Sequence, residues 1–442
     1  MSNRDDIGAF RLASGGLVDR AAPVGFTFDG RRYTGLKGDT LASALLAHGV
    51  RLVGRSFKYH RPRGIVSCGS EEPNALVELR PGEGRHEPNS RATMVELYDG
   101  LAAQSQNRFP SLGFDILALN QLLGRFIPAG FYYKTFMGPT KGAWMWFEPF
   151  IRRAAGLGRA SLAADPDRYE SMHAFCDVLV VGAGPAGLMA ARVAAEAGLS
   201  VILADEHPVP GGALKGTNAT IEGRAGHQWA SRQIDELTET GHVRVLPRTT
   251  VWGYFDHNVL GAVERVADHV ATPAPGEPRQ RGWTIRAQHV VLATGAIERP
   301  VVFPNNDRPG VMLASAARQY LHRFAVLPGR RALVVANTDS AYAAAFDLAQ
   351  AGLSVPAIAD LRAQANPDLV ERAQALGIAV HTGHGVVDVA GGRAVTGVAV
   401  GALDDRGAPK DGASKRIDCD TVLMSGGWSP TVHLAKIGRA HV

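Results

Sequence analysis

The segment that most constrains this chain is Cys176–Glu206, which reads CDVLVVGAGPAGLMAARVAAEAGLSVILADE. An apolar, β-branched strand leads into the glycine series Gly182-x-Gly184-x-x-Gly187, and a helix and a second strand follow. Gly182 permits a tight turn, Gly184 lets the backbone approach a pyrophosphate, and Gly187 lets the helix pack against the strand. The N–H groups that open the helix at Pro185 favour a phosphate. This order of elements predicts a dinucleotide-binding Rossmann domain.

Two acids, Asp205 and Glu206, end the second strand at the spacing at which a carboxylate meets the ribose hydroxyls. A carboxylate there disfavours a 2′-phosphate, so we expect NAD or FAD rather than NADP. Sequence does not separate NAD from FAD, because both present a pyrophosphate and a ribose to the same turn. Further along, Gly211-Gly212 is expected to let a loop pass close to the adenosine. The turn Ala293-Thr294-Gly295 is expected to close over the dinucleotide.

Residues 330–362 repeat the layout of strand, turn, helix, strand and acid. The turn here is Ala336–Ala341 and has none of the three glycines, so its backbone is poorly suited to approach a pyrophosphate. We therefore predict a second Rossmann-like domain without tight dinucleotide binding. The later run CDTVLMSGGWSP, with Gly426-Gly427, echoes VVLATGA. It predicts that the first Rossmann domain is completed on both sides of an insertion.

Nearer the N-terminus, VGFTFDGRRYTG predicts two strands around a turn at Asp29-Gly30. The following GDTLASALLAHGV predicts a helix capped by Asp39 or Thr40. A hairpin followed by a capped helix is how a β-grasp ferredoxin begins. A plant-type ferredoxin would next present C-x4-C-x2-C, whereas Cys68 stands alone here. We therefore predict a β-grasp domain without a cluster.

Composition narrows the class further. The formal charge of +5 over 442 residues does not by itself argue for nucleic acid. The three cysteines are widely separated, which favours neither a disulfide framework nor a metal site and suits a reducing cytoplasm. No apolar run approaches the roughly 18 to 20 residues that span a bilayer, so no membrane association is expected. Catalytic residues remain unknown, since no spacing of histidines and carboxylates suggests a triad or a metal.

Two segments stand outside these domains. Residues 108–158 are rich in aromatics yet broken by Gly and Pro, which favours an arm packed across another domain or subunit, or ordinary burial within the chain. The basic run Arg55–Arg63, interleaved with Phe57 and Tyr59, suggests a clamp for a phosphate or a partner. The alternative is a solvated loop whose arginines pair with Glu71 and Glu72.

The predicted fold class is α/β: a cluster-free β-grasp (ferredoxin-like) N-terminal domain, then a two-dinucleotide-domain, disulfide-reductase-like Rossmann scaffold. The CxxC of disulfide reductases is missing, so thiol–disulfide chemistry is not expected. The predicted boundaries are a tail at 1–20, the β-grasp domain at 21–100, an arm or linker at 101–170, the NAD(FAD)-binding Rossmann domain at 171–305 and 416–442, and the inserted Rossmann-like domain at 306–415.

Four runs together resemble the alpha subunit of heterotetrameric sarcosine oxidase. They are GRSFKYHRPRGIVSCGSEEPNALVEL, the arm GFYYKTFM…W…FEPFIRRAAGLG, VVGAGPAGLMAA with DE, and SGGWSPTVHL. The resemblance covers nearly the whole chain from about Val24, and its first two runs are more diagnostic than the glycine motif. It implies an NAD-binding subunit that is inactive without beta, gamma and delta partners. Those complexes oxidise sarcosine to glycine and peroxide, with FAD on the beta subunit and FMN at the alpha–beta boundary.

The resemblance also implies contacts to NAD, which together with the glycine and loop positions form the predicted site. The predicted cofactor-binding residues are Gly182, Gly184, Pro185, Ala186, Gly187, Asp205, Glu206, His207, Gly212, Ala213, Val251, Thr294, Gly295 and Gly426. His207 departs from the family pattern, because an arginine would be expected after the acids. The alternatives are a stand-alone FAD-dependent NADH:acceptor reductase, the alpha subunit of an opine- or hydroxyproline-type amine dehydrogenase, or a scaffold that NAD merely stabilises. The substrate amine and the stoichiometry are not readable from this chain.

The C-terminus also departs from the family. The resemblance implies a following folate-binding, aminomethyltransferase-like domain, whereas this sequence stops after SGGWSPTVHL. The last residues, IGRAHV, match a reading frame of a common sequencing adapter, so the expectation is that Ile437–Val442 are not native and that the reading frame continues past Lys436. The alternative is a genuinely short subunit.

Overall fold

The computed structural model describes residues 6–80, 82–126, 130, 135–136, 138–140, 142–410, 412 and 414–436. Ile437–Val442, the segment predicted not to be native, lies outside this range. The chain forms two compact units. Unit 1 comprises Met1–Asp165 and Pro300–Gly427, and unit 2 comprises Pro166–Arg299 and Trp428–Val442. In the described part of the chain, no helix is both long and apolar enough to cross a bilayer.

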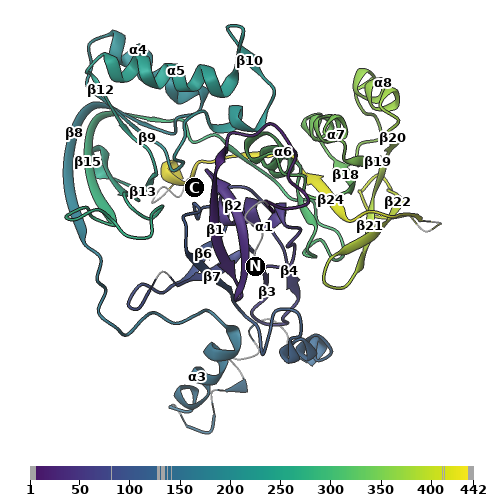
Figure 1. Cartoon of the computed structure of the whole chain (residues 1–442). Coiled ribbons are helices and arrows are strands. Elements are labelled where there is room, and N and C mark those ends of the chain that lie inside the picture. The colour runs from purple at the N-terminus through teal and green to yellow at the C-terminus, as the bar shows by residue number, and fades with distance from the viewer. Residues whose placement is uncertain are drawn as a thin grey trace. The chain divides into compact units, whose positions relative to one another are not determined.

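Unit 1 begins with a β-grasp domain whose mixed sheet has the strand order β2-β1-β7-β5-β6 (Figure 1). Its strands are β1 (Asp19–Phe28), β2 (Arg31–Lys37), β5 (Leu76–Leu79), β6 (Glu87–Arg91) and β7 (Leu101–Ser105), and β3 (Gly54–Arg55) pairs with β4 (Pro62–Arg63) in a separate ribbon. The predicted turn joins β1 to β2, and Asp29 and Gly30 both adopt positive φ there. A type I′ turn has this conformation and matches the twist of the hairpin.

The helix α1 (Leu41–Ala47) is entirely buried, and Thr40 rather than Asp39 caps it. Thr40 and Ser43 form a reciprocal capping box. Asp39 instead accepts hydrogen bonds from the Leu36 N–H at 2.8 Å and from the Arg11 guanidinium at 2.6 Å. Arg11 belongs to the predicted tail, so residues 6–18 are an integrated part of unit 1 and the prediction of a tail is wrong there.

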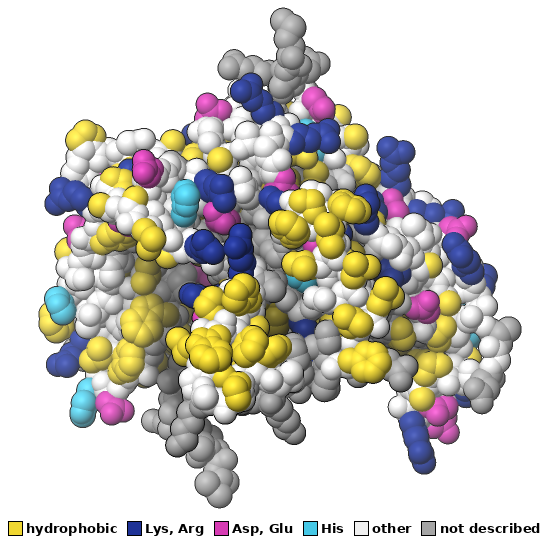
Figure 2. All heavy atoms as spheres, turned by 90° about the horizontal axis from the view of Figure 1, so that it is seen from below, with side chains coloured by type: hydrophobic (Ala, Val, Ile, Leu, Met, Phe, Trp, Pro, Cys, Tyr) yellow, Lys and Arg dark blue, Asp and Glu magenta, His cyan; other side chains and the backbone are white. Residues whose placement is uncertain are grey.

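The predicted start of the arm at residue 101 is also wrong, because β7 lies inside the β-grasp sheet between β1 and β5. The arm itself carries the 3-10 turns η1 (Ile116–Gln121) and η2 (Gly124–Phe126) and the helix α3 (Trp144–Ala155). Many apolar side chains of these segments are exposed, and Figure 2 shows apolar side chains gathered on the face that includes α3.

The second Rossmann-like domain also lies in unit 1. Its parallel sheet has the order β17-β24-β18-β19-β20, and a three-stranded sheet β21-β22-β23 accompanies it. The strands are β17 (Val311–Leu313), β18 (Arg331–Ala336), β19 (Ser354–Asp360), β20 (Ala379–Thr382), β21 (His384–Gly391), β22 (Val395–Ala402), β23 (Lys415–Ile417) and β24 (Thr421–Ser425); the helices are α6 (Ala314–Phe324), α7 (Ser340–Gln350) and α8 (Pro367–Ala375). The predicted repeat of strand, turn and helix is therefore present.

The strand β24 corrects one predicted boundary. Sequence assigned it to the first dinucleotide domain because it resembles VVLATGA. In the structure it pairs in parallel with β17 and β18, so it completes the second sheet. The chain enters unit 2 only at Trp428. The two strands have similar sequences because both are parallel strands that end in a turn.

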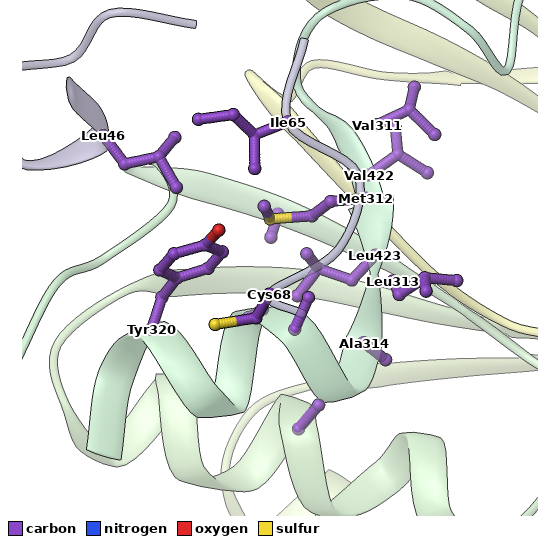
Figure 3. Packing of buried hydrophobic residues seen from close by; sticks show 14 of the residues in the cluster. Leu46, Ile65, Cys68, Val311, Met312, Leu313, Ala314, Tyr320, Val422 and Leu423 are labelled. Atoms are coloured by element: carbon purple, nitrogen blue, oxygen red, sulfur yellow. The ribbon is translucent and has the colours of Figure 1, made fainter. Parts of the chain in front are cut away.

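The β-grasp domain and the second Rossmann-like domain share one hydrophobic core. Figure 3 shows Leu46, Ile65 and Cys68 packed beside Met312 and Tyr320. The Tyr320 hydroxyl donates a hydrogen bond to the Ser67 carbonyl at 2.8 Å. The two domains therefore form one compact unit with a common core rather than two bodies joined by a linker.

Unit 2 is built on a six-stranded sheet of order β12-β9-β8-β15-β14-β13, with α4 and α5 on one face (Figure 1). Its main elements are β8 (Tyr169–Val181), α4 (Pro185–Glu196), β9 (Val201–Ala204), α5 (Gly226–Glu239), β12 (Val243–Leu246), β13 (Thr249–Phe255), β14 (Val259–Glu264) and β15 (Gln280–Leu292). The smaller ones are η3 (Gly212–Gly216), β10 (Thr220–Ile221), β11 (Arg224–Ala225), η4 (Asp256–Asn258), β16 (Ala296–Glu298), β25 (Trp428–Pro430) and α9 (His433–Lys436). Buried clusters cover both faces of the sheet, as expected for a parallel sheet core.

Candidate dinucleotide site

The glycine turn of unit 2 joins β8 to α4. Gly182 has a φ of 103°, and a Cβ there would lie 2.4 Å from the Ala293 carbonyl oxygen. A Cβ on Gly187 would lie 1.8 Å from the Gly182 carbonyl oxygen. No side chain fits at either position, so both glycines are required for the close packing of strand, helix and β15. These are the roles that the spacing predicted for the first and third glycines.

Gly184 has a different role. Its φ of −72° suits any residue, and the nearest atom to a Cβ there is the Gly212 Cα at 4.0 Å. Gly212 has a positive φ of 49°, and a Cβ there would lie 3.0 Å from the Gly184 Cα. Protein packing therefore leaves space beside Gly184, at the helix N-terminus, where a side chain would occupy the approach of a ligand. Pro185 and Ala186, the first residues of α4, are exposed beside it.

Asp205 is tied into the glycine turn. Its carboxylate accepts one hydrogen bond from the Ala183 N–H at 2.6 Å and a second from the His207 N–H at 2.8 Å. The end of the second strand is thus fixed to the fingerprint by a carboxylate. Sequence assigned this residue to the ribose hydroxyls. The structure adds a hydrogen bond from the Ala183 N–H, which orders the glycine turn itself. The spacing between the glycines and the acid does not predict this contact.

The segment around Glu206 and His207 is held by residues that sequence reasoning missed. The Arg265 guanidinium donates to the Glu206 carbonyl at 2.5 Å, and the Arg248 N–H donates to the His207 carbonyl at 3.1 Å. The Glu206 carboxylate lies 3.9 Å from the His207 ring, and both side chains are partly exposed. Arg265 is 59 positions beyond Glu206, so a local pattern does not connect them.

The turn after β15 is anchored to the returning C-terminal segment. The Thr294 hydroxyl donates to the Thr431 carbonyl at 2.6 Å, and the Thr431 N–H donates to the Gly295 carbonyl at 2.9 Å. Gly295 is exposed and has a φ of 70°. This turn follows the strand that contacts Gly182, so it belongs to the same end of the sheet.

The remaining predicted contacts differ in their placement. Ala213 is exposed in η3, directly after Gly212. Val251 is half-buried in β13, two residues after Thr249, whose N–H donates to the Asp205 carbonyl at 2.7 Å. Gly426 follows β24 and belongs to unit 1, whereas every other predicted contact lies in unit 2. The structure therefore gathers most of the predicted residues at one end of the unit 2 sheet.

The corresponding end of the second Rossmann-like sheet is filled by the protein's own side chains. Asp360, at the end of β19, is fully buried and accepts from Arg362 at 2.8 Å and from the Tyr342 hydroxyl at 2.8 Å. Arg362 also donates to Asp339, beside the N-terminus of α7, at 2.8 Å. Tyr342 and Arg362 thus occupy the Asp360 carboxylate, which stands where a ribose would otherwise bind. This supports the prediction that the glycine-free turn does not bind a dinucleotide tightly.

The thiols are not arranged for redox chemistry. Cys68, Cys176 and Cys419 are all buried, and none of them is joined in a disulfide within the described residues. Burial raises the pKa of the Cys176 thiol to about 11 and that of the Cys419 thiol to about 11, so both stay protonated at neutral pH. In the described residues, no group of three or more His, Cys, Asp or Glu side chains could hold a metal.

The basic run Arg55–Arg63 is paired, but not with the predicted partners. Arg61 forms hydrogen bonds to the Asp307 carboxylate at 2.6 and 2.7 Å, and Arg63 contacts the same carboxylate. Glu72, one of the expected partners, is instead buried and accepts hydrogen bonds from backbone N–H groups. The run therefore joins the β-grasp domain to the loop before β17.

Comparison with known proteins agrees with this architecture. The family model described as pyridine nucleotide-disulphide oxidoreductase matches residues 176–441, and the model described as 2Fe-2S iron-sulfur cluster binding domain matches residues 21–108. A sarcosine oxidase subunit alpha from Rhizobium meliloti (strain 1021) is 53% identical over 97% of this chain and 42% of its own length. One from Corynebacterium sp. (strain P-1) is 38% identical over 94% of this chain and 38% of its own length. A crystal structure of L-proline dehydrogenase from P. horikoshii superposes with a TM-score of 0.60 at 18% identity, covering 97% of this chain and 65% of that one.

The fold and the site together define a two-dinucleotide-domain oxidoreductase scaffold that carries an intact nucleotide turn in unit 2. The chain belongs to the pyridine nucleotide-disulphide oxidoreductase family. The predicted resemblance to sarcosine oxidase alpha subunits is confirmed over nearly the whole chain. The chain spans about two fifths of the length of these relatives.

The domain at residues 21–108 matches a cluster-binding family but lacks the cysteines that would hold a cluster. A [2Fe–2S] cluster needs four ligands, and Cys68 is the single cysteine between residues 21 and 108. The backbone N–H groups of Val66, Ser67, Asn74 and Ala75 converge on the Glu72 carboxylate. These residues do not fit a cluster, so the matched domain shares the fold of the family but not its ligands.

Proposed function

We propose that this chain is the NAD-binding part of the alpha subunit of a multi-subunit, flavin-dependent sarcosine oxidase. Such a complex would oxidise the N-methyl group of sarcosine and release glycine and peroxide, with the methyl carbon leaving as formaldehyde or as methylenetetrahydrofolate. The observation that carries this proposal is the 53% identity over 97% of the chain to a sarcosine oxidase subunit alpha. The amine-oxidising residues would lie on a partner chain, and this chain alone would be inactive.

The geometry of unit 2 supports a bound dinucleotide, for which we propose NAD. The space beside Gly184 would admit the pyrophosphate, and the N–H groups at the start of α4 would donate to it. The Asp205 carboxylate accepts two backbone hydrogen bonds, and its further lone pairs would accept hydrogen bonds from ribose hydroxyls. NAD supplies hydride-transfer capacity when bound. Its role here would be structural or regulatory, since a ligand that binds only the folded state stabilises it.

FAD at the same turn, with NADH as the reductant, is the alternative. A stand-alone reductase of that kind needs a second site for the nicotinamide donor. The corresponding position carries Asp360 already paired with Arg362 and Tyr342, and its turn has no glycine. This observation favours a single bound dinucleotide and therefore favours the subunit over the stand-alone reductase.

Assembly with beta, gamma and delta subunits is supported by the surface of the arm. Leu122, Trp146 and Phe150 each expose more than three fifths of their surface, which is unusual for large apolar residues. We propose that these residues face a partner chain. FMN at the boundary with a beta subunit is part of the same proposal.

The deciding experiment is to purify the full chain, denature it and identify the released nucleotide by absorbance and mass. Colourless protein that releases NAD is the expected result. Yellow protein that releases FAD would instead support the stand-alone reductase, and NADH oxidation would then be assayed. Co-expression with sarcosine oxidase beta, gamma and delta subunits tests assembly separately. Failure of all three to co-purify would contradict the assignment as a subunit.

A further inference from the structure

A hollow of about 270 Å³ in unit 1 is lined by arginines from four separate segments. Arg55 comes from β3, Arg61 from the loop before β4, Arg308 from the loop before β17, and Arg393 from the turn between β21 and β22. Asp307 is the acid in the lining. At roughly 30 Å³ per water molecule, the hollow is large enough for a tetrahedral anion.

Asp307, the one acid in the lining, is already paired with two arginines. Arg61 binds both oxygens of Asp307, and Arg63 contacts the same carboxylate. Two guanidinium groups therefore share one negative charge. Asp307 cannot in addition neutralise the arginines on the other walls of the hollow.

Arg55 is buried and donates mainly to carbonyl groups. It bonds to the Leu112 carbonyl at 2.9 Å and to the His60 carbonyl at 2.9 Å. Its nearest carboxylate is Asp115 at 3.4 Å, which also accepts from the His60 ring at 2.7 Å. Carbonyl groups satisfy most of the donors of Arg55, and Asp115, which it shares with the His60 ring, is its counter-ion.

Arg308 and Arg393 add two more cations. Arg308 donates to the Val389 carbonyl, and Arg393 is exposed and forms no hydrogen bond within the described part of the chain. Asp388, which accepts from Asn305 at 2.8 Å, is the remaining acid close to Arg308. Burial and the charge of Arg61 lower the pKa of Arg308, and burial lowers that of Arg55, with Arg393 opposing the attraction of Asp115. Burial is the main cause of both pKa shifts, and the neighbouring arginines act in the same direction.

We propose that this hollow binds the phosphate group of a small ligand through Arg61, Arg308 and Arg393. Five arginines meet three carboxylates, Asp115, Asp307 and Asp388, so an anion would relieve the excess charge. A guanidinium group presents donors in a planar fork that matches phosphate oxygens. The donors that these three guanidinium groups do not use within the protein come from different directions, which suits the three terminal oxygens of a phosphate better than the two oxygens of a carboxylate. The site is in unit 1 and does not depend on the dinucleotide turn of unit 2.

The test is calorimetric titration of the full chain with inorganic phosphate, with acetate and with chloride, all at the same ionic strength. We expect saturable binding of phosphate only. Arg393→Ala should weaken it by about tenfold or more, the usual effect of losing one charge-assisted hydrogen bond. Arg393 is exposed, so this substitution leaves the core intact.

Arg406→Ala is the matched control, because Arg406 is also exposed and lies in the turn after β22. It should bind phosphate like the parent chain. Absence of phosphate binding, or equal weakening by Arg406→Ala, would overturn the proposal. Equal binding of acetate would overturn the assignment to phosphate. Arg308→Ala, checked for an unchanged circular dichroism spectrum, should reproduce the effect of Arg393→Ala.

Discussion

The Glu72 carboxylate accepts a hydrogen bond from the Ser67 N–H at 2.7 Å, inside the loop where a ferredoxin would hold its cluster. Three further N–H groups, those of Val66, Asn74 and Ala75, donate to the same carboxylate at 2.8 to 3.0 Å. In a cluster-binding loop, backbone donors surround a buried anion. Here a side chain of the protein supplies that negative charge, so the loop is ordered without a ligand.

Glu72→Ala should therefore strongly destabilise unit 1. Removing the carboxylate leaves four backbone donors without their acceptor in a site that is 1% exposed. Each buried, unsatisfied donor costs about 1 to 3 kcal/mol, so we expect a loss of at least about 3 kcal/mol in the free energy of unfolding, measured in urea. Glu71→Ala, at the exposed neighbouring position, should change it by less than about 0.5 kcal/mol. Similar effects of the two substitutions would contradict this role for Glu72.

The two glycine substitutions at the unit 2 turn should separate folding from binding. Gly184→Ala fits the surrounding protein but fills the ligand approach, so the variant should keep its melting temperature and bind the nucleotide at least about tenfold more weakly. Gly187→Ala places a Cβ against the Gly182 carbonyl and should lower the melting temperature by several degrees. Calorimetric titration and thermal melts measure the two effects. If Gly184→Ala bound normally, the space beside Gly184 would not be the pyrophosphate position.

Asp205 and Glu206 should behave differently when substituted. Asp205→Ala removes the acceptor for the Ala183 and His207 N–H groups, so it should reduce both stability, by about 1 to 3 kcal/mol, and nucleotide affinity. Glu206→Ala, at a partly exposed side chain, should reduce affinity and leave the melting temperature within a degree or two. Urea unfolding of the nucleotide-free variants makes the comparison. Equal loss of stability in both would show that Asp205 does not order the turn.

Arg362→Ala tests the end of the second Rossmann-like sheet at which Arg362 and Tyr342 bind the Asp360 carboxylate. The substitution leaves the fully buried Asp360 without its cation, although the Tyr342 hydroxyl and the backbone N–H of residue 362 still donate to it, so we expect a cost of about 1.5 to 3 kcal/mol. The free energy of unfolding should fall by an amount of that order. Arg372→Ala on α8, whose guanidinium lies over the Phe346 ring at 4.4 Å, is the control and should cost about 1 kcal/mol. The parent chain should bind one nucleotide per chain. Two bound nucleotides per chain would contradict the interpretation that the second Rossmann-like domain does not bind one.

The pH dependence of stability should reveal the pair of Asp307 with Arg61 and Arg63. Burial opposes ionisation, but the hydrogen bond from Arg61 and the charge of Arg63 outweigh it and lower the pKa of Asp307 below its ordinary 3.8. Because the folded-state pKa is the lower one, the stabilisation is present above about pH 4 and is lost as the pH falls through the folded-state value. Asp307→Asn should therefore destabilise the chain at pH 7, and its difference from the parent should shrink below pH 4. A difference that is constant with pH would contradict this assignment.

Sequence by itself determined the parts of this protein that depend on short-range geometry. The Asp29-Gly30 hairpin, the capped helix after Thr40 and the turn from Gly182 to Gly187 follow from backbone preferences of a few neighbouring residues. The glycine-free turn at Ala336–Ala341 was likewise informative, because the absence of glycine restricts the backbone locally. An identity of 53% over 97% of the chain to a sarcosine oxidase subunit alpha then showed the family.

Only the tertiary structure decided what depends on partners distant in sequence. The apolar sequence of β24 fits a buried strand in either sheet, so only tertiary packing decides that it pairs with β18. Arg61 meets Asp307 across 246 positions, whereas local charge pairing had suggested Glu71 and Glu72. Because Arg61 pairs with Asp307, Glu72 accepts hydrogen bonds from the backbone of its own loop instead. Burial and hydrogen-bond satisfaction are properties of the whole fold, since each buried donor must find whichever acceptor the packing brings to it.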